Sequence, residues 1–82
     1  MFSNNEWTLK GKIVKAEEKK RGYWLSAKGI AENPTLFSSD IYNIDCWISK
    51  RIALKKPKGQ IYVIGKFMFK NKDCYFVAER FL

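Results

Sequence analysis

The sequence predicts an all-β fold, a barrel of five short strands that forms one domain over residues 1–82. Apolar and polar side chains alternate in separate runs, with the period of a strand that has one buried face. The runs are separated by segments rich in glycine, proline, asparagine or charge, which favour turns and loops. The expected strands lie at residues 7–16, 22–31, 41–50, 59–70 and 74–81.

The first expected strand carries apolar and basic residues on opposite faces. The inward face holds Trp7, Leu9 and Ile13, and the outward face holds Thr8, Lys10 and Lys12. The alternation slips near Val14. The charged segment Glu17–Gly22 that follows is either a solvated hairpin loop or a contact for an anion.

The second and third strands each place a tryptophan on the outward face. The second turns Tyr23, Leu25 and Ala27 inward, and Trp24, Ser26 and Lys28 outward. The third has Tyr42, Ile44, Cys46 and Ile48 on one face, and Asn43, Asp45, Trp47 and Ser49 on the other. Residues 32–40 between them are expected to form a loop, in which Phe37 either caps the core or stacks on a base.

The last two strands are expected to form a hairpin around the turn Asn71–Asp73. The fourth strand has an inward face of Ile61, Val63, Gly65, Phe67 and Phe69, and an outward face of Tyr62, Ile64, Lys66, Met68 and Lys70. The glycine marks a position where the strand can bend sharply. Residues 50–58, which connect the third strand to the fourth, are expected to form a short helical link that Pro57 and Gly59 end.

Charge indicates a polyanionic partner. The formal net charge is +8 and the isoelectric point is about 9.7, although charge alone does not separate nucleic acid from an anionic membrane. The basic residues are segregated, because no acid lies between Asp45 and Asp73. That interval contains Lys50, Arg51, Lys55, Lys56, Lys58, Lys66, Lys70 and Lys72.

The composition does not indicate a catalytic site or a metal site. The chain has no histidine, and its acidic residues show no spacing typical of an acid/base pair. Cys46 and Cys74 are expected to be buried free thiols, too few for a zinc site. We therefore expect no enzyme, no metal and no cofactor. A secretory signal and an apolar run of membrane-spanning length are both missing, so a soluble cytoplasmic protein is expected.

Five strands, a long connection after the second and a short link after the third match the element order of an oligonucleotide-binding (OB) fold, a five-stranded Greek-key barrel. Three stretches also resemble bacterial single-stranded-DNA-binding proteins. These are the opening segment Leu9-Lys10-Gly11-Lys12-Ile13, the lysine-glycine turn and strand of residues 58–67, and the final strand of residues 75–82. The resemblance covers nearly the whole chain.

That resemblance implies roles for particular residues. Tyr62 stands where the family's fourth strand has a base-stacking aromatic, and Trp24 and Trp47 fall in the strands that supply its other stacking residues. Tyr42 is an alternative to Trp47 if the alignment slides. The chain departs from the family in its curtailed link after the third strand and in ending without an acidic tail. It is therefore similar to a short, tailless relative in replication, repair or recombination, such as a primosomal replication protein or a phage or mobile-element version.

The residues themselves support a binding hypothesis. Sequence-independent binding of single-stranded DNA needs aromatic platforms among cations, and the predicted site is Lys12, Trp24, Lys28, Trp47, Tyr62, Lys66 and Lys70. Two alternatives remain open: an OB barrel that serves as a protein interaction module, and an RNA-binding barrel. Outward Ile64 and Met68 predict a surface covered by another copy, so a homo-oligomer, a dimer or tetramer, is expected.

Overall fold

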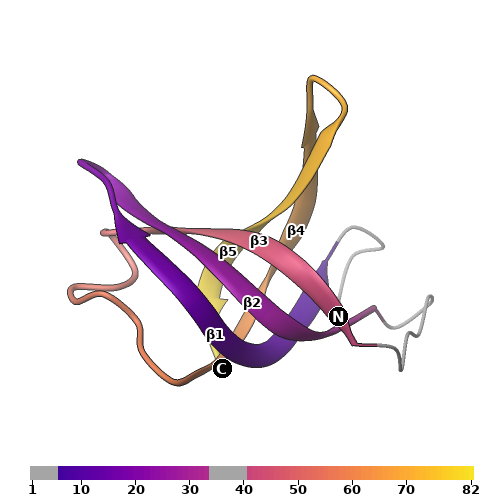
Figure 1. The fold of residues 1–82 in the computed structure, drawn as a ribbon, viewed down its shortest axis with the longest axis horizontal. Helices are drawn as coiled ribbons and strands as arrows, with labels where there is room; N and C mark the ends of the chain where they lie inside the picture. The colour runs from indigo at the N-terminus through magenta and orange to yellow at the C-terminus, as the bar shows by residue number, and fades with distance from the viewer. Residues whose placement is uncertain (1–5, 34–40) are drawn as a thin grey trace.

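The computed structural model describes residues 6–33 and 41–82, which form a closed all-β barrel of five strands in the order β1-β2-β3-β5-β4 (Figure 1). The strands are β1 (Trp7–Glu18), β2 (Gly22–Glu32), β3 (Tyr42–Ser49), β4 (Gln60–Lys70) and β5 (Asp73–Phe81). All neighbours are antiparallel except β3 and β5, which run parallel. The five expected strands and the final hairpin are confirmed. The architecture is compatible with an OB-like barrel.

The barrel interior is filled by the alternate residues that the pattern predicts to face inward. Its fully buried members come from every strand: Leu9, Leu25, Cys46, Ile48, Val63 and Phe76. Trp7 and Phe67 close one end, where their rings meet edge to face with centroids 5.2 Å apart. A side-chain period of two therefore fixes which face of β2 and β3 looks outward, and which face of β1 does so as far as Ile13.

Two irregularities bend the strands. The pairing of β1 with β2 shifts between Ile13 and Lys15, which leaves Val14 unpaired and 67% exposed. The slip predicted near Val14 is thus a β-bulge. The pairing of β4 with β5 shifts between Ile64 and Gly65, at the glycine predicted to mark a bend. Bulges of this kind increase the local twist, which helps a short sheet to close.

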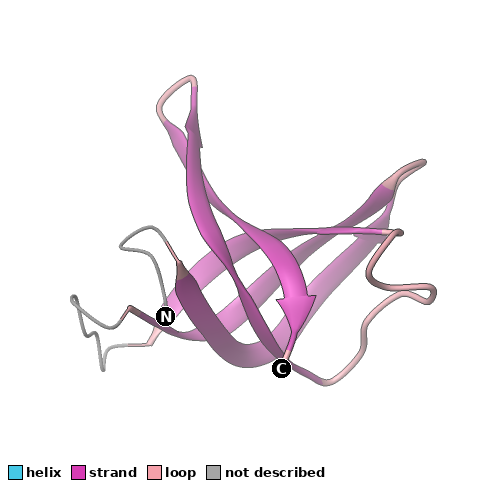
Figure 2. Cartoon of the chain, turned by 180° about the vertical axis from the view of Figure 1, so that it is seen from behind, coloured by secondary structure: helices cyan, strands magenta, loops and turns pink. Residues whose placement is uncertain are grey.

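The β4–β5 hairpin continues beyond the barrel as an arm, residues 68–75 (Figures 1 and 2). Pairing of β1 with β4 ends at Gly65, and β3 pairs with β5 only at Phe76 and Val77, so the arm's two strands pair only with each other. The prediction that Phe69 and Cys74 are buried is therefore wrong. Phe69 is 78% exposed and Cys74 is exposed, because the barrel has ended where these residues face inward.

Ile64 also differs from its prediction. It lies on the outward side of β4 but is only 2% exposed. Its cross-strand neighbours are Thr8 on β1 and Arg80 on β5. An ion pair 3.3 Å long joins Arg80 to Glu6, the residue before β1. Ile64 is thus covered within the chain and offers no apolar surface to a partner.

The connection between β3 and β4 contains no helix, so the expected helical link is wrong. After one turn, in which the amides of Ile52 and Ala53 donate to the carbonyl of Ser49 (both 3.1 Å), the chain continues without regular secondary structure to Gly59. Ala53 is buried, and the Leu54 carbonyl accepts a hydrogen bond from the Tyr23 hydroxyl at 3.5 Å. The Leu54 carbonyl is therefore not available for a helical hydrogen bond, and Pro57 has no amide hydrogen to donate to one.

Two smaller expectations complete the comparison. Tyr42 lies on the same side of β3 as Ile44 but is 46% exposed, because it is the first residue of the strand. Phe37 falls outside the described residues. Within residues 6–33 and 41–82, no helix is long and apolar enough to cross a membrane.

Candidate nucleic-acid interface

Three aromatic side chains form a cluster on the outer surface of β2, β3 and β5. Trp24 and Trp47 are directly opposite each other on β2 and β3, with ring centroids 5.2 Å apart and planes inclined at 55°. Trp24 also meets Tyr75 of β5, with centroids 5.3 Å apart and planes at 73°. We call Trp24, Trp47 and Tyr75 the aromatic cluster. All three side chains are half-buried, so each ring is held by its neighbours yet keeps part of its surface open.

Gly22 sets the position of the Trp47 ring. A Cβ atom added to Gly22 would lie 2.7 Å from Cζ2 of Trp47 and 2.4 Å from the carbonyl oxygen of Ile48. Contacts this short do not occur between real side chains, so only glycine leaves room for the indole here. The glycine at the start of β2 thus leaves room for the Trp47 ring to approach the strand.

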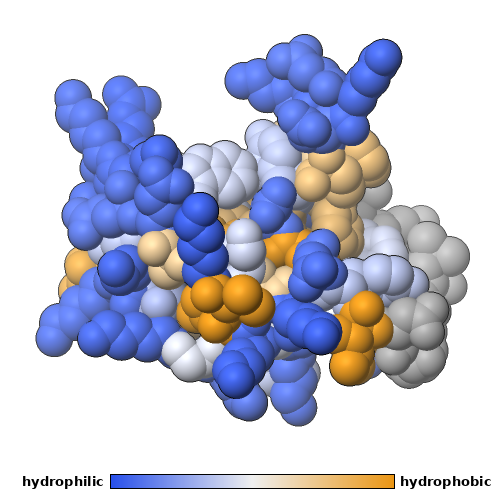
Figure 3. All heavy atoms as spheres, in the orientation of Figure 1, coloured by the Kyte–Doolittle hydropathy of each residue, from blue (hydrophilic) through white to orange (hydrophobic). Residues whose placement is uncertain are grey.

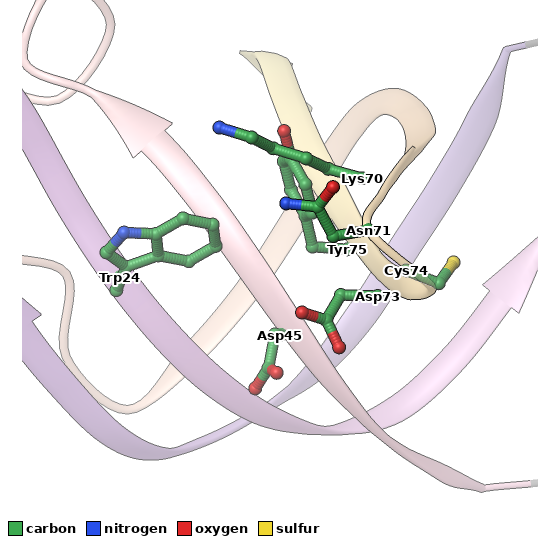
Figure 4. A pocket seen from close by; sticks show the side chains of 7 residues that line it. All are labelled: Trp24, Asp45, Lys70, Asn71, Asp73, Cys74 and Tyr75. Atoms are coloured by element: carbon green, nitrogen blue, oxygen red, sulfur yellow. The ribbon is translucent and has the colours of Figure 1, made fainter.

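A hollow of about 600 Å³ opens beside the aromatic cluster (Figure 4). It lies where the arm diverges from β3, and Trp24, Asp45, Lys70, Asn71, Asp73, Cys74 and Tyr75 line it. In Figure 4 the Lys70 amine extends along one side toward Trp24, whereas the Asp45 and Asp73 carboxylates lie on another. A phosphate would therefore be attracted to the Lys70 side, and an uncharged base to the side of the rings.

Trp24 borders a second, smaller hollow of about 200 Å³ on the β1 side. Lys15, Glu17, Leu25, Ser26 and Asp45 line it together with the indole. The ring therefore lies between two recesses, each of which contains one lysine. In this position Trp24 could stack on a flat group such as a base, while a lysine in either recess contacts an anionic group attached to it.

The β1–β2 and β4–β5 hairpins extend beyond the barrel in different directions, one toward the upper left and one toward the top of Figure 1, and they carry cations on two sides of the cluster. Figure 3 shows hydrophilic side chains at both hairpin ends, with a recess between them. In the β1–β2 hairpin, Lys19 pairs with Glu17 at 2.8 Å, and this contact lowers the pKa of Glu17. Lys20 and Arg21 form no ion pair within the described chain. They remain free to attract an anion.

The structure brings together four of the seven predicted site residues. Trp24 and Trp47 are paired, and the row continues through Val77 to Lys66 on β4. Lys70 lines the large hollow. Tyr42 pairs with Gly29, away from Trp24, so Trp47 is the aromatic of β3 that meets Trp24.

The other three predicted residues lie on a different surface. Tyr62 pairs with Lys10, whose amine lies 5.7 Å from the centre of the tyrosine ring, and Lys12 pairs with Lys28. These residues occupy the outer face of β1 and its neighbours β2 and β4. The sequence indicated correctly that they are exposed. It did not indicate that they belong to a second surface.

Tyr75 was not among the predicted site residues. Its signal was present in the alternation of β5, where Phe76 and Ala78 are buried and Tyr75 and Val77 fall on the other face. Lys15 was missed for another reason. The bulge at Val14 turns Lys15 outward, where it lies opposite Ser26.

The described residues contain no group of acidic, cysteine or histidine side chains arranged to hold a metal ion. Cys46 lies in the core, and burial raises the pKa of its thiol to about 12. The thiol is therefore protonated at neutral pH and lies away from the aromatic cluster.

Fold and surface together define the chain as a small closed β-barrel with an aromatic and cationic outer face. Comparisons with family models, with curated proteins and with solved structures gave no significant match.

Proposed function

We propose that this chain binds single-stranded nucleic acid, DNA in the first place, largely without sequence preference. The observation that carries the proposal is the aromatic cluster on β2, β3 and β5, which is flanked by lysines on two hairpins. In OB folds the faces of the second and third strands, with the loops after the first and fourth, bind oligonucleotides. The strand order and the position of this cluster support the assignment of the barrel to that fold.

Stacking supplies the affinity in this proposal. A base that stacks on an aromatic ring gains about 1 to 3 kcal/mol, whatever its identity, because every base has a π face. Trp24 and Tyr75 border the large hollow. Their contact with each other restricts the side-chain motion of both rings before a base binds. A platform that is already ordered loses less conformational entropy on binding.

Lysines supply the electrostatic part. Lys66 continues the row of Trp24 and Trp47 across the sheet, and Lys70 stands over the hollow. Neither forms an ion pair with a carboxylate of the described residues. Their charge remains available to phosphates and, with the net charge of +8, attracts a polyanion from a distance.

The family and cellular role are part of the same proposal. A short relative of the bacterial single-stranded-DNA-binding proteins, acting in the cytoplasm in replication, repair or recombination, fits the quoted motifs and this surface. An RNA-binding barrel would use the same stacking chemistry. RNA is therefore included as a ligand in the experiment.

A titration of tryptophan fluorescence tests the proposal. Oligo-dT of about 10 to 20 nucleotides is expected to quench the emission, and duplex DNA of the same length to bind much more weakly. If about four phosphates are neutralised, the logarithm of the binding constant falls with log salt at a slope of about −3. Oligo-rU, titrated in parallel, shows whether the site prefers DNA.

Variants separate the two contributions. Trp24→Ala or Trp47→Ala is expected to weaken binding by about 1 to 3 kcal/mol with little change in salt slope. Lys66→Ala or Lys70→Ala is expected to flatten the slope by somewhat under one unit. Circular dichroism establishes that each variant is folded. Full affinity in both folded tryptophan variants would contradict the proposed surface.

A second candidate function is a protein interaction module, which the arm favours. Phe69 is 78% and Met68 39% exposed, and both lie beside a largely apolar hollow of about 610 Å³. Exposed apolar patches mark protein interfaces. Loss of partner binding in Phe69→Ser, with oligonucleotide binding absent in the unaltered chain, would favour this candidate over the first.

A further inference from the structure

A basic groove lies on the outer face of β1, away from the aromatic cluster. Its volume is about 320 Å³, and Lys10, Lys12, Lys28, Ile30, Ile41 and Gln60 line it. The lysines come from β1 and β2, two paired strands in the wall of the barrel. Tyr62, which is 47% exposed, borders the same face through its contact with Lys10.

The groove concentrates positive charge that forms no ion pair with the described residues. Lys12 and Lys28 are directly opposite each other on paired strands, and like charges in that position destabilise a sheet. No carboxylate of residues 6–33 and 41–82 lies within ion-pair distance of Lys10, Lys12 or Lys28. An anion between the amines would offset their repulsion. The arrangement is therefore suited to a phosphate.

Close packing of the backbone holds these lysines in place. Gly11 and Gly29 are opposite each other, and a Cβ atom on Gly29 would lie 2.2 Å from the carbonyl oxygen of Lys10. The two strands can approach this closely only because both positions lack a side chain. The lysine stems thus start from a rigid part of the barrel, and a ligand would not have to order a loop.

A carboxylate separates the groove from the aromatic cluster. Both surfaces share β2, where Lys28 lies four positions after Trp24, or about 13 Å along the strand. Ser26 lies between them, and its hydroxyl donates to Oδ1 of Asp45 at 3.3 Å. Asp45 is exposed on the outer face of β3, where it also borders the hollows beside Trp24, so a phosphate chain that ran directly from the cluster to the groove would pass a negative charge.

We propose that the basic groove holds a second segment of single-stranded nucleic acid while the aromatic cluster holds a first, so that one barrel bridges two segments. Lys10, Lys12 and Lys28 contact the phosphates, and Tyr62 offers a ring to a base. The inference rests on the proposed function, since it needs the first segment on the aromatic cluster. Its consequence is an additional activity, in which complementary strands held on one barrel anneal faster.

Energy transfer between two oligonucleotides tests this bridging. One non-complementary strand of about 10 nucleotides, a length that one barrel accommodates, carries a donor, and another carries an acceptor. Transfer between them on addition of protein is expected. A longer strand that carries the donor at one end and the acceptor at the other tests whether both segments can belong to one molecule. If they can, the two ends approach each other and energy transfer rises when protein is added.

The double variant Lys12→Glu/Lys28→Glu changes only exposed side chains of the groove. Its matched control is Lys55→Glu/Lys56→Glu, which makes the same change of charge on exposed residues of the β3–β4 connection. Relative to this control, the groove variant is expected to lose transfer by roughly tenfold at a fixed protein concentration. Quenching of tryptophan fluorescence by a single short oligonucleotide is expected to be equal in the two variants, because both lower the net charge from +8 to +4 and leave the aromatic cluster unaltered.

Each outcome separates the two proposals. Equal transfer in the groove variant and the control would overturn the bridging. If an oligonucleotide quenches the tryptophan fluorescence of the wild-type protein but no energy transfer occurs, the bridging is overturned as well. The proposed function is then still supported. Absence of quenching as well as transfer would overturn the proposed function, and the bridging with it. A parallel loss of quenching and transfer in the groove variant alone would show one continuous site instead of two.

Discussion

The rings of Trp24 and Tyr75 meet edge to face with centroids 5.3 Å apart, although β3 separates their strands in the barrel. Tyr75 lies at the base of the arm, just before β5 joins β3 at Phe76. The contact therefore reaches across β3 and connects the arm to β2. It gives the aromatic cluster a structural role beside its proposed binding role, because the ring contact joins the base of the arm to the wall of the barrel.

We predict an energetic coupling between Trp24 and Tyr75. In a double-mutant cycle with Trp24→Leu and Tyr75→Leu, urea unfolding is expected to give a coupling of about 0.5 to 1.5 kcal/mol, typical of an edge-to-face pair. The matched cycle combines Trp24→Leu with Tyr62→Leu on the other surface, where the free energies of unfolding should add within about 0.5 kcal/mol. Equal values in the two cycles would show that the ring contact does not stabilise the arm.

The faces of the strands were predictable wherever a strand is paired on both sides along its length. In β2 the alternation of Tyr23, Trp24 and Leu25 places each side chain correctly, since a strand with one buried face fixes its own register. The same alternation fails at Phe69 and Cys74. It continues past the point where β1 and β3 stop pairing with the hairpin, and where that point lies depends on contacts distant in sequence.

The sequence predicted which of the site residues face outward, but not which of them lie together on one surface. The outward position of Trp24, Trp47 and Tyr62 follows from local period, but their grouping follows from the closure of the barrel. Closure places Tyr62 beside Lys10 of β1 and leaves the tryptophans with Tyr75. A local pattern says that a residue is outside, whereas the order of the strands decides which residues share an outer surface.

The turn of the arm offers a stabilising substitution. Asn71 and Lys72 both have positive φ, 50° and 71°, as a two-residue hairpin turn of the primed type requires. Lysine is strained there, whereas Asn-Gly is the preferred sequence. Lys72→Gly is expected to raise the free energy of unfolding by about 0.5 to 1 kcal/mol, measured with urea. Lys72→Ala removes the same charge without relieving the backbone, so it should give no such gain.

Stability at high pH is expected to depend on Cys46. Burial raises the pKa of this thiol from 9.0 to about 12, so the folded protein retains a proton that the unfolded chain loses. The stabilisation is complete below about pH 9 and is lost as the pH rises from there toward 12, at up to about 1.4 kcal/mol per pH unit. Cys46→Ala should flatten the decline in the free energy of unfolding above pH 9. Cys74→Ala, which alters the exposed thiol, should retain the wild-type slope.

Self-association is expected through the arm, although Ile64, one of the two residues that first suggested it, is buried within the chain. Phe69 and Met68 remain exposed beside the hollow that Trp7 and Phe67 also line, and a second copy would remove this apolar surface from water. Sedimentation at micromolar concentration should therefore give a mass above that of the monomer, and Phe69→Ser should reduce it to that of the monomer. Leu54→Ser is the control, because Leu54 is 91% exposed on the β3–β4 connection and should not affect assembly. A strictly monomeric wild-type protein at these concentrations would contradict the prediction.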